Sequence, residues 1–166
     1  MAHVHGVTVV LVVLPQPSDD ERELLLAWLQ CLREAVLRKA EGLDETQVRW
    51  RPDGKLISIA GIVNHLAHLE WRWIDGALHG QAVSRSEGEF VVPTERPFAD
   101  VAATYRERAD RTDQIVRAAD LADPCDHPKH PGITLRWVLL HLIEETARHA
   151  GHADATRELL DGRTGV

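Results

Sequence analysis

Glu145 and His149 lie one helical turn apart within residues 135–160, on the side of that segment that should face the protein core. The apolar and chemically active residues there follow the i, i+3, i+4, i+7 spacing of an amphipathic helix: Val138, Leu142, Glu145, His149, His152, Thr156 and Leu159. A carboxylate on an apolar stripe is costly unless its charge is compensated. Helical bundles commonly compensate such a charge with a divalent metal, so this pair predicts a metal site.

The other helices must supply the rest of that site. Zinc and similar ions bind imidazole nitrogen and carboxylate oxygen, with three protein ligands where a catalytic position stays open. Residues 58–80, the second predicted helix, hold His65 and His68. At ~100° per residue, His65 lies on the flank of the apolar stripe, whereas His68 points nearly opposite to it. We therefore predict His65, Glu145 and His149 as the metal ligands.

The same spacing allows other interpretations. A histidine and a glutamate at i and i+4 are equally well explained by a surface or half-buried ion pair. His141 and His152 lie on the same stripe, so the ligands could instead be His141 with Glu145, or His149 with His152. Glu70, on the apolar side of the second helix, could pair with an arginine. Arg72, Arg136 and Arg148 are candidates for recognising acidic groups on a substrate.

Four amphipathic segments position these residues. Helices are expected from Ser18 to Gly42, from Ser58 to about Gly80, from Phe98 to about Ala119 and from Thr134 to Gly162, with Ser18, Ser58 and Thr134 as N-caps. The loop of residues 81–97 includes a predicted short strand at residues 90–92. Trp28, Trp73 and Trp137 are assigned to the core, and Trp50 and Trp71 to a pocket or an interface. The pattern predicts an all-α four-helix bundle, with Trp71 as a contact in a homodimer.

Length and composition limit the remaining choices. The chain has 166 residues, enough for one domain over residues 18–162 with an N-terminal extension over residues 1–17 that forms an edge strand or a packing arm. A net charge of −7 argues against nucleic acid or an anionic membrane as partner. Two cysteines are too few for a disulfide scaffold, which favours a cytoplasmic protein. Cys31 is expected in the core, and Cys125 could be a reactive thiol.

Two segments carry a resemblance to a known family. SIAGIVNHLAHLE (residues 58–70) and LLHLIEETARHAGHAD (residues 139–154) resemble the DinB/YfiT-like superfamily of metal-binding four-helix bundles. The likeness is closest to an actinobacterial branch of unknown function, related to the N-terminal domain of mycothiol-dependent maleylpyruvate isomerase. Many members place a histidine on helix two and a His-x-x-x-His pair on helix four. Here Glu145 replaces the first histidine of that pair, as in the isomerase branch, so the resemblance also implies His65, Glu145 and His149.

The resemblance further implies a function. A divalent metal, zinc in the first place and nickel, iron or manganese as alternatives, would activate a low-molecular-weight thiol such as mycothiol for transfer or isomerisation. The expected partners are that small-molecule thiol and an electrophilic substrate. Two other functions fit the same ligands: a non-catalytic, metal-stabilised bundle that dimerises or binds a partner, and a metal-dependent hydrolase that uses metal-bound water.

Overall fold

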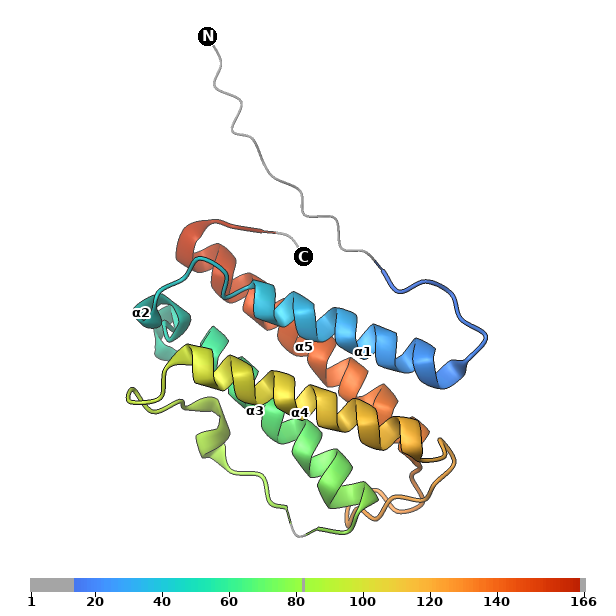
Figure 1. Cartoon of the computed structure of the whole chain (residues 1–166). Coiled ribbons are helices and arrows are strands. Elements are labelled where there is room, and N and C mark those ends of the chain that lie inside the picture. Colours follow the sequence, from blue (N-terminus) through green and yellow to red (C-terminus); the bar gives the residue numbers. More distant parts are fainter. Residues whose placement is uncertain (1–13, 82, 165–166) are drawn as a thin grey trace.

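Four long helices form the architecture of the computed structural model, which describes residues 14–81 and 83–164 (Figure 1). They are α1 (Glu21–Arg38), α3 (Ile59–Trp71), α4 (Phe98–Ala118) and α5 (Leu135–Asp161). Helix α1 packs mainly against α5 and α3 mainly against α4, and contacts of α3 with α5 and of α1 with α4 close the bundle. The predicted all-α four-helix bundle is therefore confirmed.

Most predicted helix boundaries agree with the structure. Ser58 is the N-cap of α3, and its hydroxyl oxygen accepts a hydrogen bond from the Gly61 amide at 3.1 Å. Thr134 precedes α5 in an extended conformation. Gly162 ends α5 with a φ of 75°, in the left-handed region that glycine adopts without strain.

The first helix begins and ends at residues other than those predicted. Asp20, not Ser18, is the N-cap of α1, because its carboxylate accepts the amide hydrogen bonds of Arg22 and Glu23. The Ser18 hydroxyl accepts instead from the amide of Asp20, so Ser18 lies two residues ahead of the N-cap position. Regular α-helix ends at Arg38, ahead of the predicted stop at residue 42.

The connections between helices also differ from the prediction. The predicted strand at residues 90–92 is wrong: Glu87–Phe90 forms a 3₁₀ turn, here called the 87–90 turn. The link after α1 contains a short helix, α2 (Glu45–Val48), which a capping box between Asp44 and Gln47 stabilises. A π-helical segment, Arg72–Leu78, extends α3 to the predicted end near residue 80.

The core is apolar and draws on all four long helices. Its fully buried members include Leu29, Val36, Ile62, Leu66, Val116, Val138, Leu139 and Leu142. Trp73 is buried as predicted, but Trp28 and Trp137 are each 37% exposed, so their assignment to the core is wrong. Both lie on the flank of a buried stripe, where a side chain is only partly covered by the neighbouring helices.

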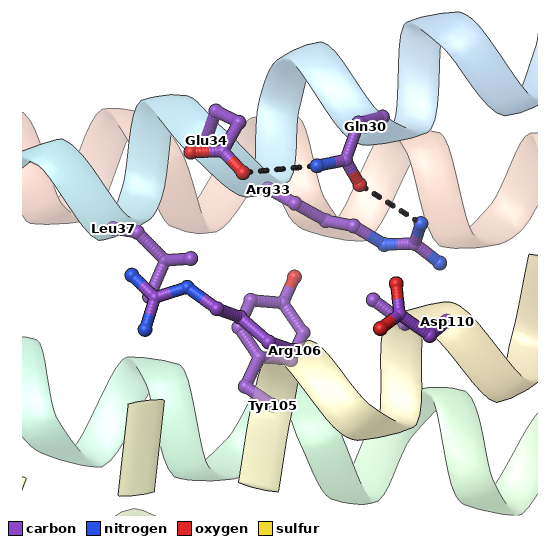
Figure 2. Close-up of a pocket in the computed structure, with 8 residues that line it drawn as sticks. Gln30, Arg33, Glu34, Leu37, Tyr105, Arg106 and Asp110 are labelled. Carbon is purple, nitrogen blue, oxygen red and sulfur yellow. Dashed lines mark hydrogen bonds between the residues drawn. The ribbon is translucent and has the colours of Figure 1, made fainter. Parts of the chain in front are cut away.

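A buried arginine forms ion pairs inside this core and links three of the helices. Arg33 of α1 donates two hydrogen bonds of 2.8 Å to the Glu70 carboxylate on α3 and a third of 2.8 Å to Asp113 on α4. Glu70 therefore has the arginine partner expected for it. Figure 2 shows Arg33 beside a hollow of about 180 Å³ between α1 and α4, with Tyr105 rising from α4 towards α1.

Residues 1–13, which hold most of the predicted N-terminal extension, lie outside the described residues. Among the helices that are described, none is both long enough and apolar enough to cross a membrane.

Candidate metal centre

The three predicted metal ligands meet at the contact between α3 and α5. One potential ligand atom from each of His65, Glu145 and His149 lies within 4.8 Å of the other two. His149 Nε2 is 3.8 Å from the nearer Glu145 oxygen, and the centres of the His65 and His149 rings are 4.8 Å apart. The i, i+4 spacing on α5 sets the first pair, and packing of α3 on α5 brings His65 to them.

The two histidines form a buried end of this cluster, and Glu145 forms a side that is open to solvent. His65 and His149 are 2% and 6% exposed, whereas the Glu145 side chain is 16% exposed. Glu145 also pairs with Arg148 at the protein surface. A small molecule could therefore approach the cluster from the side of Glu145.

The two histidines have ring nitrogens that the protein leaves available to bind a cation. His65 Nδ1 is hydrogen-bonded to Glu89 at 3.1 Å, so its Nε2 is the nitrogen left for another ligand. His149 Nδ1 is buried and has no hydrogen-bond partner among the described residues. Because an unpaired buried nitrogen is costly, the cluster carries a coordination or hydrogen-bonding capacity that the protein itself does not satisfy.

Both imidazoles are held in their neutral form. Burial lowers the pKa of His65 to about 4, although the hydrogen bond to the Glu89 carboxylate acts in the opposite direction. Burial, together with a smaller electrostatic effect of the neighbouring His65 and His152, lowers the pKa of His149 to about 4. Neutral imidazole is the form that binds metal, so no proton has to leave either ring at neutral pH.

These pKa values predict an acid-sensitive metal-free protein. Between pH 6.5 and about pH 4 the unfolded chain binds protons at His65 and His149 while the folded chain does not, so stability falls as the pH decreases through this range. Urea unfolding in EDTA at pH 7.5, 6.0 and 5.0 should give a falling midpoint. His149→Phe should flatten the profile and the exposed control His152→Asn should not. A midpoint independent of pH would contradict the prediction.

Glu89 is a site residue that the sequence analysis missed. It lies in the 87–90 turn, 24 positions from His65, yet its side chain is 2% exposed and contacts the His65 ring. Sequence spacing gives no reason to join a loop glutamate to a helix histidine. A local signal was present, because Ser86-x-x-Glu89 is a capping-box pattern that fixes the glutamate side chain over its own turn.

The alternative ligands take different positions. His141, Glu144 and Glu145 form a second group of potential ligand atoms within 4.8 Å, but Glu144 is exposed and paired with Arg148. His152 is exposed, and its ring centre lies 5.4 Å from that of His149. His68 Nδ1 bonds to its own helix, at the Asn64 carbonyl.

The three arginines considered for substrate recognition already have carboxylate partners. Arg72 binds Glu89, Arg136 binds Glu21, and Arg148 binds Glu144 and Glu145.

The two cysteines also differ from expectation. Cys125 is buried, and burial with the neighbouring Asp123 raises the pKa of its thiol to about 11, so it is not a reactive thiol. Cys31, expected in the core, is only partly buried.

The fold and this cluster define a class of protein: an all-helical bundle with a His, Glu and His group between two of its helices. Residues 24–162 match the family described as mycothiol-S-transferase, and the chain belongs to that family, which is DinB/YfiT-like.

Solved structures agree with the fold. A crystal structure of a conserved protein from Enterococcus faecalis aligns with a TM-score of 0.62 and 14% identity, covering 88% of this chain and 100% of the other. At this identity the likeness establishes the fold alone. No curated protein gives a significant match.

Proposed function

We propose that this protein is a metal-dependent mycothiol S-transferase. His65, Glu145 and His149 hold the divalent cation, and a low-molecular-weight thiol is transferred to an electrophilic substrate. The observation that carries the proposal is the cluster of two neutral imidazoles and one half-buried carboxylate in a chain of the mycothiol-S-transferase family. Two histidines and a glutamate are a ligand set that catalytic zinc adopts, so zinc is the proposed metal.

The open side of the cluster favours catalysis over a purely structural role. Structural zinc sites are closed by four protein ligands, whereas catalytic sites keep a position for water or substrate. The described residues supply three ligands, and His152, the candidate fourth, lies exposed outside the group. Glu145 borders solvent, so a thiol could reach the cluster from the side of this residue.

The proposed chemistry is a substitution at carbon. When bound, the cation would lower the pKa of the thiol and hold its sulfur as a nucleophile at neutral pH. The sulfur forms a bond to the electrophilic carbon, the leaving group departs with its bonding electron pair, and the thiol proton passes to solvent. The chain's own residues keep the centre ordered: Phe90 stacks on His65 at 4.2 Å and keeps water from that ring face.

Metal removal tests this function. Untagged protein should contain close to one divalent ion per chain by mass spectrometry. Transfer of mycothiol to monochlorobimane should stop after treatment with a chelator and return when zinc is added. Transfer that is unchanged in the metal-free protein would refute the metal dependence. Ester hydrolysis that needs no thiol would favour the hydrolase alternative instead.

A further inference from the structure

The 87–90 turn is seated directly on the metal-binding part of α3. A Cβ atom added at Gly61 would collide with the backbone carbonyl oxygen of Phe90, so only glycine allows this approach. One helical turn further on, the Phe90 ring stacks on the His65 ring at 4.2 Å. The turn is thus packed against the same face of α3 that presents His65 to the cluster.

Glu89 is fixed within this turn from several directions. One carboxylate oxygen binds Arg72 and the Ser86 amide, the latter at 3.2 Å, and the other lies 3.1 Å from His65 Nδ1. Its backbone carbonyl accepts a 2.8 Å hydrogen bond from the Asn64 side chain. The carboxylate therefore cannot turn away from His65 without breaking contacts to two other residues.

The charge of Glu89 decides the direction of its bond to His65. One oxygen of the Glu89 carboxylate accepts hydrogen bonds from the Arg72 guanidinium and the Ser86 amide, and both contacts favour the ionised carboxylate. An ionised carboxylate only accepts hydrogen bonds. The His65 ring must therefore donate from Nδ1, which leaves the lone pair on Nε2.

We propose that Glu89 is a positioning residue for the metal centre: it holds His65 in the Nδ1-protonated tautomer and aims Nε2 at the cluster with Glu145 and His149. This inference rests on the proposed function, because it assigns a role at the same cation site. Carboxylate partners of ligating histidines fix ring orientation and raise ligand basicity, and their loss typically weakens metal binding by about 10–100-fold. The 87–90 turn is then part of the metal centre, although Glu89 itself is not one of the proposed ligands.

The test compares zinc affinity in three proteins by competition with a chromophoric chelator. Glu89→Gln keeps the size of the side chain but removes its charge, and it should bind zinc about 10–100-fold more weakly than the wild type. Glu95→Gln changes an exposed glutamate in the same connection and should bind zinc like the wild type. Thermal unfolding of the metal-free proteins measures whether either change damages the fold.

A second readout needs no metal. In ¹⁵N-resolved NMR spectra of the metal-free wild-type protein at pH 7, His65 should be the Nδ1-protonated tautomer, and Glu89→Gln should shift it towards a mixture. A purely structural role of Glu89 would lower the melting temperature without this shift. Observation of the Nε2-protonated tautomer in the wild type would overturn the proposal.

The outcomes separate the two proposals. If the wild type binds zinc and Glu89→Gln binds it equally tightly, the role of Glu89 is overturned and the proposed function stands. If the wild type binds no divalent metal, the proposed metal centre fails, and the role assigned to Glu89 fails with it.

Discussion

His149→Ala should bind zinc roughly a hundredfold or more weakly than the wild-type protein, because it removes one of the three proposed ligands. His149 supplies a neutral imidazole at the buried end of the cluster, and no other described histidine is placed to substitute for it there. Mycothiol transfer at limiting zinc should fall in parallel. Competition with a chromophoric chelator measures the zinc affinity, and the rate of mycothiol conjugation measures the effect on transfer activity.

The matched control for this variant is His152→Ala. His152 lies on the next turn of α5, close to His149 but exposed and outside the ligand group. Its removal should leave zinc affinity unchanged. Equal losses in the two variants would favour the alternative in which His149 and His152 bind the metal together. Unchanged affinity in His149→Ala would remove the proposed centre altogether.

Arg33→Met should destabilise the protein by about 3–5 kcal/mol, the cost typical of removing one partner from a buried ion pair. Arg33 is 1% exposed, and Glu70, which receives two of its hydrogen bonds, is also 1% exposed. Burial acts against the charge of Arg33, yet Glu70 keeps the Arg33 pKa raised above its usual value. The variant leaves the Glu70 carboxylate without its partner in an apolar interior.

Urea unfolding of a small series measures this cost. The double variant Arg33→Met, Glu70→Leu should recover most of the lost stability, because it removes both charges and their desolvation. Glu23→Gln is the matched control: its ion pair with Arg117 also joins α1 to α4, but both side chains are about half exposed. It should cost no more than about 1 kcal/mol. A loss in Arg33→Met no larger than in the control would contradict the prediction.

The helices could be predicted from the sequence because their information is local. Apolar residues at helical spacing, Ser58 and Thr134 before the first turns, and Gly162 after the last turn act within a few residues of the chain. The i, i+4 pair of Glu145 and His149 is equally local, since any α-helix places such residues on one face. The wheel position of His65 was sufficient to select it over His68 because the two lie about 60° apart, which turns His68 further from the apolar stripe of the same helix.

Contacts between segments required the tertiary structure. Periodicity identified Glu70 as a charge on a buried face but could not name Arg33, 37 positions away, as its partner. It also could not distinguish the flank of a stripe from its centre, so Trp28 and Trp137 were assigned to the core although each meets solvent. Such exposure depends on the angle at which neighbouring helices cross, which no single helix specifies.

Glu89 depends both on local sequence signals and on contacts between distant segments. The hydrogen bonding with which Ser86 and Glu89 close a turn lies within four residues, so the local sequence is enough to specify it. The packing of this turn on α3 at Gly61, which places the carboxylate beside His65, depends on contacts between segments that are distant in the chain. The physical reason is that a loop is positioned by the surface that receives it, whereas a helix is specified by hydrogen bonds along its own chain.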